Sequence, residues 1–159
     1  MVAKSGTEWV LLAYRMPREP SSPRIAVWRR LRKLGAVQVV DGLVALPADA
    51  RTKEQLEWVA DLAVEAGGEA TVWIARLASA GQERELESRM AGEATEAYQA
   101  VIDEVAELER TPEVVQRRTI ARLRRELRRI GQRDFFPPPA RDKAVAAVEN
   151  LAELVGASS

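Results

Sequence analysis

Residues 9–47 read W-V-L-L-A-Y-R-M-P-R-E-P-S-S-P-R-I-A-V-W-R-R-L-R-K-L-G-A-V-Q-V-V-D-G-L-V-A-L-P, and this stretch decides the fold. Its first part, with residue 8 before it, is rich in Trp, Val, Leu and Tyr, which is typical of a buried strand. A proline-rich loop follows, and Ser21 or Ser22 can cap a helix that has Pro23 at its first position. Gly35 ends this helix. Two apolar runs then flank Asp41-Gly42, a pattern that predicts a β-hairpin.

The helix over residues 23–34 is amphipathic and basic. Three-residue spacing places Ile25, Trp28 and Leu31 on one face, which we expect to point inward. Three cations fall on the opposite side: Arg29, Arg30 and Lys33. Arg24 lies within the arc of the apolar stripe, so we expect it to meet a carboxylate, a carbonyl or an anion near the helix N-terminus.

A second helix is predicted over residues 51–66, with Leu56, Val59, Ala60 and Ala63 inward. A fourth strand is predicted over residues 70–76. The order β-α-β-β-α-β predicts a ferredoxin-like fold, an antiparallel sheet with two helices on one face. We therefore expect an α+β protein with a ferredoxin-like domain over residues 8–78. A helical hairpin with a short terminal helix packed on it is expected over residues 80–155, built from helices at 80–109, 113–131 and 143–155.

The formal net charge of zero conceals strong segregation of charge along the chain. Residues 83–109 hold nine acids and two arginines, whereas residues 112–133 hold eight arginines and two glutamates. One interpretation is a charge-matched antiparallel helical hairpin. The other is a nucleic-acid surface, because Lys and Arg clustered on one face neutralise phosphates. Some of the eight arginines would face solvent in either case, so both interpretations stay open.

The composition excludes several classes of site. The chain has no cysteine and no histidine, which excludes disulfides, thiolate ligands and histidine-based triads. A metal-dependent nuclease on this fold would need an aspartate where the first strand ends, and that place holds Tyr14, Arg15 and Met16. We therefore expect a protein that is not an enzyme and has no cofactor. The absence of a long apolar run and of a secretory signal predicts a cytoplasmic protein with no membrane partner.

Several segments resemble the N-terminal domain family of the chromate resistance protein ChrB. The resemblance is carried by the quoted stretch from W-V-L-L to L-G-A, by E-W-V-A-D-L-A-V-E-A-G-G-E-A-T-V-W and by I-G-Q-R-D-F-F, and it covers residues 9–151. Its most specific parts are the P-R-E-P-S-x-P-R turn and the G-G-E-A-T-V-W segment. The first half is also similar to the middle domain of phenylacetate-type repressors, and more distantly to a CRISPR-associated nuclease, whose aspartate is missing here.

The resemblance implies a chromate-responsive, DNA-associated transcriptional regulator, and we expect the chain to contact DNA as a homodimer. Phosphate contacts would come from two helices and are assigned to Arg29, Arg30, Lys33, Arg118, Arg122, Arg125 and Arg129. The alternative is an oxyanion-sensing or dimerisation module without DNA contacts. Arg18 and Arg24 bracket the proline-rich turn and are the candidate ligands of chromate, a divalent oxyanion. ChrB proteins carry a further C-terminal domain, so the chain is expected to be a short member or a fragment that works with that domain.

Overall fold

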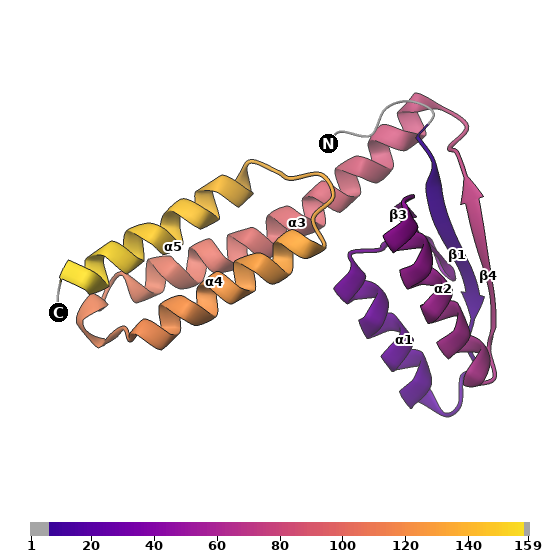
Figure 1. The fold of residues 1–159 in the computed structure, drawn as a ribbon, viewed down its shortest axis with the longest axis horizontal. Helices are drawn as coiled ribbons and strands as arrows, with labels where there is room; N and C mark the ends of the chain where they lie inside the picture. Colours follow the sequence, from indigo (N-terminus) through magenta and orange to yellow (C-terminus); the bar gives the residue numbers. More distant parts are fainter. Residues whose placement is uncertain (1–6, 158–159) are drawn as a thin grey trace. The chain divides into compact units, whose positions relative to one another are not determined.

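The computed structural model describes residues 7–157, and its chain forms two compact units that divide between Met90 and Ala91 (Figure 1). The first unit holds a sheet and its helices. The second unit is made of helices alone. The division falls inside a long helix, α3 (Ala80–Leu108), so this helix contributes its first turns to one unit and its remainder to the other.

The first unit alternates strands and helices in the predicted order. Its elements are β1 (Trp9–Arg15), α1 (Ser21–Leu34), β2 (Val37–Val40), β3 (Leu43–Pro47), α2 (Ala50–Glu65) and β4 (Glu69–Ala75). The strands form one sheet in the order β2-β3-β1-β4, and every neighbouring pair is antiparallel. Both helices lie on one side of this sheet (Figure 1). The prediction of an α+β protein with helices after the sheet is confirmed.

The core of the first unit is built on the central strand β1. Val10 and Leu12 are fully buried and stand opposite Leu46 and Val44 of β3. From α2, the predicted residues Leu56, Val59 and Ala63 are fully buried. The sequence therefore predicted correctly which face of α2 packs on the sheet.

Of the three residues predicted to point inward from α1, only Leu31 is buried. Ile25 and Trp28 are 42% and 50% exposed, and the buried residues are Val27 and Leu31. Val27 and Leu31 are four residues apart, so they lie on one narrow stripe of the helix and are buried together. Ile25 and Trp28 lie to one side of that stripe. The predicted serine cap is also wrong, since the helix begins at Ser21 and Pro20 occupies the N-cap position without a side-chain hydrogen bond.

Two glycines and one aspartate occupy positions where the backbone requires those residue types. Gly42 has φ 79°, and a β-carbon there would lie 2.8 Å from the carbonyl oxygen of Tyr14. Gly68, in the G-G-E-A-T-V-W segment, is closer still, because a β-carbon would lie 2.6 Å from the Arg15 carbonyl oxygen and 2.9 Å from that of Ala63. Asp49 caps α2, accepting the backbone N–H of Thr52 at 2.7 Å in a reciprocal capping box.

The second unit contains the rest of α3, a short 3₁₀ turn at Pro112–Val114, α4 (Arg117–Gln132) and α5 (Ala140–Ala157). The helix predicted over residues 113–131 is thus divided, and the last helix begins three residues earlier than predicted. A continuous apolar core joins the three helices, with Tyr98, Val105, Leu123, Ile130 and Leu151 among its most buried members. Tyr98 was not foreseen as a core residue.

Candidate functional site

The arginines of α4 divide into those that are paired and those that are not. The helix buries Ile120, Leu123 and Ile130, and this fixes which side its cations occupy. Arg122 donates to both carboxylate oxygens of Glu104 on α3, the shorter contact being 2.5 Å. Arg124 forms a bidentate pair with Glu149 on α5, at 2.9 and 2.8 Å. The hydrogen bond from Arg124 lowers the pKa of Glu149.

Arg122 and Arg129 belong to the predicted phosphate contacts, and both have acidic partners. Arg129 pairs with Glu126 of its own helix at 2.8 Å. These pairs are exposed, and exposed ion pairs contribute about 0–1 kcal/mol to stability, so a phosphate can replace the carboxylate at small cost. The charge-matched hairpin is therefore present in part, through Arg122 and Glu104.

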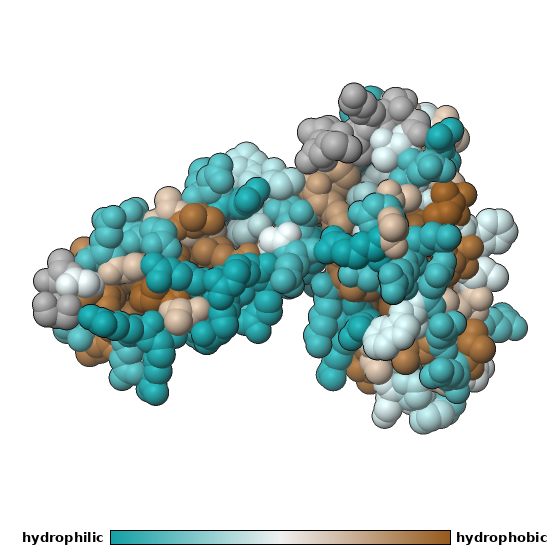
Figure 2. All heavy atoms as spheres, viewed as in Figure 1, coloured by the Kyte–Doolittle hydropathy of each residue, from teal (hydrophilic) through white to brown (hydrophobic). Residues whose placement is uncertain are grey.

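Four exposed arginines of α4 have neither an acidic nor a hydrogen-bonding partner within residues 7–157. They are Arg117, Arg118, Arg125 and Arg128, and we call them the outward arginine row. Two of them, Arg118 and Arg125, are among the predicted phosphate contacts. In Figure 2 strongly hydrophilic side chains gather along α4. Helix α4 thus carries both arginines that pair with acids and arginines without such a partner.

The three cations predicted from the first helix are all exposed: Arg29, Arg30 and Lys33. The guanidinium of Arg30 lies over the ring of Trp58 on α2, 4.5 Å from its centroid. Arg32, on the same helix, lies 5.2 Å from the centroid of Trp28. Both are cation–π contacts, which leave the charge available to an anion.

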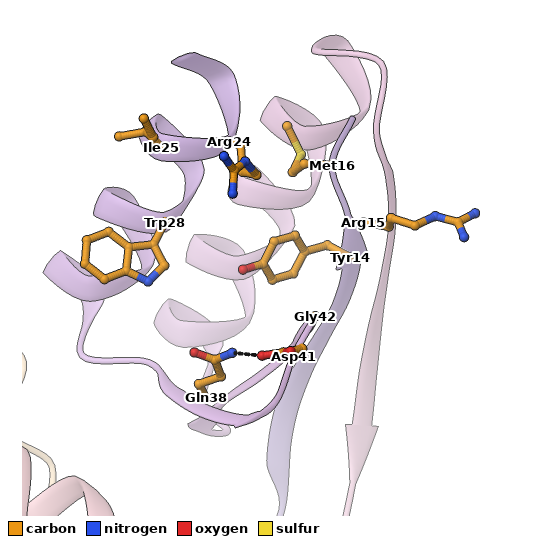
Figure 3. A pocket seen from close by; sticks show the side chains of 9 residues that line it. All are labelled: Tyr14, Arg15, Met16, Arg24, Ile25, Trp28, Gln38, Asp41 and Gly42. Atoms are coloured by element: carbon orange, nitrogen blue, oxygen red, sulfur yellow. Dashed lines mark hydrogen bonds between the residues drawn. The ribbon is translucent and has the colours of Figure 1, made fainter. Parts of the chain in front are cut away.

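A pocket of about 700 Å³ opens between the start of α1, the end of β1 and the β2–β3 turn (Figure 3). It is lined by Tyr14, Arg15, Met16, Arg24, Ile25, Trp28, Gln38, Asp41 and Gly42. Tyr14, Arg24 and Trp28 point into the space between the elements, whereas Arg15 points away (Figure 3). Gln38 donates to Asp41 at 3.0 Å, and burial together with the Asp41 charge raises the pKa of Tyr14.

The structure separates the two predicted oxyanion ligands. Arg24 lines this pocket, and Arg18 is exposed outside it. Within the described part of the chain, neither arginine forms an ion pair with Glu19, the acid that lies between them in the sequence. Arg24 is therefore the one of the two that faces a cavity of ligand size.

Acidic side chains suited to metal binding do not converge in the described part of the chain. Strand β1 ends with Tyr14 and Arg15, as the sequence indicated. Among residues 7–157 no three acidic side chains come together in a way that could hold a metal ion. None of the helices in that same range combines the length and the apolar character that crossing a bilayer requires.

A buried polar pair in the second unit was missed from the sequence. The hydroxyl of Tyr98 donates to Oδ2 of Asp134 at 2.9 Å. Burial, followed by this hydrogen bond, raises the pKa of Tyr98 to about 12. The other oxygen of Asp134 is buried without a hydrogen-bond partner. The only signal in the sequence was an aspartate directly before F-F-P-P-P.

Comparison with known proteins agrees with the segments quoted above. Residues 24–117, more than half of the chain, match the family described as "Protein ChrB, N-terminal". The chain is 28% identical over 142 residues to Protein ChrB of Cupriavidus metallidurans, covering 87% of this chain and 43% of that protein. No solved structure matches. The match over more than half of its length shows that this chain belongs to the ChrB N-terminal domain family.

Proposed function

We propose that this chain is a regulatory, non-catalytic domain of a chromate-resistance system, and that it contacts DNA through the outward arginine row of α4. The observation that carries the proposal is the division of the α4 arginines. Arg122 and Arg124 pair with acids of the neighbouring helices, and Arg129 pairs with Glu126 of α4 itself. Four exposed arginines of α4 are then left without acidic partners. Such a row attracts phosphates regardless of base sequence.

The dimensions of the row suit a nucleic-acid backbone. Arg117 and Arg128 are eleven residues apart, which corresponds to about 16 Å along a helix. Duplex DNA carries one charge per about 1.7 Å of axis, so roughly ten phosphates fall within that length. Four arginines can therefore each find a phosphate without distortion of the helix.

The first unit supports a binding role over a catalytic one. We infer that its β-α-β-β-α-β order, with strands arranged β2-β3-β1-β4, is the ferredoxin-like arrangement. The position that would need an aspartate for metal-dependent hydrolysis holds Tyr14 and Arg15. A domain of this kind contributes binding surfaces, and the rest of a longer ChrB protein would share the regulatory work.

A second candidate role, the sensing of an oxyanion, is favoured by the pocket at Arg24. Its guanidinium has no ion-pair partner in the described chain and lies in the second turn of α1, whose N-cap residue Pro20 offers no side-chain hydrogen bond. Free backbone N–H groups and a guanidinium are the donors that chromate requires. Asp41 lines the same pocket, and its negative charge opposes an anion there.

Thermal unfolding in the presence of chromate, with sulfate as a second oxyanion, tests the sensing role. Arg24→Ala should abolish the chromate-dependent rise in Tm, while Arg18→Ala, outside the pocket, should keep it. Asp41→Asn should enlarge the rise, because it removes the opposing charge. A chromate shift that persists in Arg24→Ala would remove this pocket from the response.

A fluorescence-anisotropy titration tests the DNA role. The chain is titrated against labelled DNA from upstream of its own gene, at two salt concentrations, with and without chromate. We expect binding that weakens steeply with salt and is released by chromate. Absence of binding at both salt concentrations would assign the DNA contacts to another part of ChrB proteins and leave this domain the sensing or dimerisation role.

A further inference from the structure

The two helices that cover the sheet carry opposite charges on their exposed sides. Helix α1 has five basic residues and no acid. Helix α2 exposes Glu54, Glu57, Asp61 and Glu65, and its two cations, Arg51 and Lys53, lie in its first turn. We call this surface the helix-layer face and define it by Ile25, Arg29, Arg32, Lys33, Glu54, Trp58, Asp61, Leu62 and Glu65, all of which are exposed.

These opposite charges do not neutralise each other within the first unit. The helices lie side by side (Figure 1), and Arg30 reaches across to the ring of Trp58. Nevertheless, the ion pairs of the described residues include none between α1 and α2; Lys53 pairs with Glu57 inside α2. The basic row and the acidic row therefore remain available to an external surface that carries the same two rows in exchanged positions.

Large apolar side chains accompany the charges on the same face. Trp58 is 54% exposed, and Leu62, one turn further along α2, is 37% exposed. Ile25 adds a third apolar side chain from α1. Tryptophan and arginine at the centre of a patch, with charges around them, are the composition of an energetically dominant interface region. Charged residues alone would indicate a solvated face, and the apolar side chains argue against that.

We propose that the helix-layer face binds a second copy of this chain, with each α1 lying on the α2 of the partner. Strands β1 and β3 are antiparallel, and each is followed by a helix on the same side of the sheet, so α1 and α2 run antiparallel. The two-fold axis of this dimer is parallel to the helices and lies between the two copies, above the line where α1 and α2 of one copy meet. Rotation about this axis places α1 of one copy on α2 of the other. Each basic row then meets an acidic row twice in the dimer, and the two Trp58 rings lie near the axis.

The lengths of the rows agree with this pairing. The basic residues of α1 extend from Arg24 to Lys33 and the acids of α2 from Glu54 to Glu65, about 14 and 16 Å along their helices. A dimer with α1 on α1 would oppose like charges along its whole length and is disfavoured. DNA is a poorer occupant than a second copy, because the acids of α2 lie directly beside the cations and repel phosphates.

Sedimentation velocity with the full chain at 5–200 µM, in 50 mM and 500 mM NaCl, tests the proposal. Two charge-reversed variants are made, one with Arg29→Glu, Arg32→Glu and Lys33→Glu, the other with Glu54→Lys, Asp61→Lys and Glu65→Lys. We expect the wild-type chain to have the mass of a dimer that weakens at 500 mM salt, and each variant to be monomeric. An equimolar mixture of the two variants should recover the dimer, because opposite charges then face each other again. Circular dichroism checks that each variant keeps its helices.

A single substitution probes the apolar centre of the same face. Trp58→Ala should raise the dimer dissociation constant at least tenfold, whereas Trp73→Ala, an equally exposed tryptophan of β4, should leave it unchanged. A monomeric wild type at 200 µM, dimeric charge-reversed variants or a mixture that stays monomeric would each overturn the proposal. Loss of binding to a duplex DNA in the α1 variant, with no change of mass, would overturn it in favour of a nucleic-acid surface. This inference does not rest on the proposed regulatory function.

Discussion

Replacing the outward arginine row by glutamine should change how DNA binding depends on salt. In the variant, Arg117, Arg118, Arg125 and Arg128 are all changed to Gln. None of the four has an acidic partner in the described chain, and glutamine forms helix well, so the second unit should keep its stability within about 0.5 kcal/mol per substitution. The variant therefore isolates the phosphate contacts.

The expected magnitude follows from counterion release. Each neutralised phosphate contributes about 0.9 to the slope of log affinity against log salt, so four contacts contribute about 3.6. A rise from 50 to 200 mM salt is fourfold, and a slope of about 3.6 turns it into a loss of affinity of roughly 150-fold. Over this salt range the wild-type chain should therefore lose roughly 150 times more affinity for DNA than the variant does.

The assay is fluorescence anisotropy with a labelled 30-base-pair duplex of mixed sequence, at four salt concentrations. A matched control changes Arg15, Arg51, Lys53 and Arg76 to Gln in the first unit, which alters the net charge by the same amount. The control should keep the wild-type slope. Equal slopes in the wild-type chain and the α4 variant would refute the assignment, and equal reductions in both variants would show that only total charge matters.

Three further substitutions test contacts that stabilise each unit internally. Tyr98→Phe should cost about 1–3 kcal/mol in the free energy of unfolding, because neither carboxylate oxygen of Asp134 then has a described hydrogen-bond partner. Since the pKa of Tyr98 is raised to about 12, wild-type stability should fall as pH rises from about 10 to 12, and the difference between wild type and Tyr98→Phe in urea unfolding should shrink over that range. Asp49→Ala should cost about 0.5–2 kcal/mol through loss of the capping box on α2, measured in the same way, and Asp49→Ser should restore most of it. Gly68→Ala should cost about 1–3 kcal/mol, because its β-carbon would meet two backbone oxygens; an unchanged Tm would show that this turn relaxes freely.

The order of strands and helices could be predicted from the sequence because local signals mark each boundary. Gly35 takes the left-handed conformation at the end of α1, with φ 80°, and the Asp41-Gly42 pair closes the hairpin. Such signals act over a few residues and do not depend on what packs nearby. The division of the helix at residues 113–131 was missed because Val115 and Gln116 carry no breaker of their own.

The orientation of α1 could not be predicted for a different reason. Apolar residues stand at Ile25, Ala26, Val27, Trp28 and Leu31, and together they surround more than half of the helix. Periodicity then permits several inward faces, and the sheet beneath selects the stripe of Val27 and Leu31. Packing on the sheet, and not the periodicity of the helix, therefore decides which side of α1 is buried.

For the candidate DNA surface, too, the sequence could not show which tertiary contacts each side chain makes. The predicted phosphate contacts Arg118, Arg122, Arg125 and Arg129 are all exposed on α4. The partners of Arg122 and Arg124 lie 18 and 25 residues away on other helices. Sequence spacing along one helix could not distinguish these paired arginines from Arg118 and Arg125.

Opposite charges on adjacent helices have different consequences in the two units. In the second unit α3 and α4 share the ion pair between Glu104 and Arg122, so part of the charge difference stabilises the bundle itself. In the first unit α1 is basic and the exposed side of α2 is acidic. The described contact of a charged side chain of one helix with the other helix is that of Arg30 with the ring of Trp58. Solvated charges are tolerated anywhere, but a fully acid-free helix beside an acidic one, with a half-exposed tryptophan at their seam, is the pattern that a self-complementary dimer uses. If the helix-layer face binds a second copy, two outward arginine rows are present in one particle, and their combined salt dependence on DNA exceeds that of a single chain.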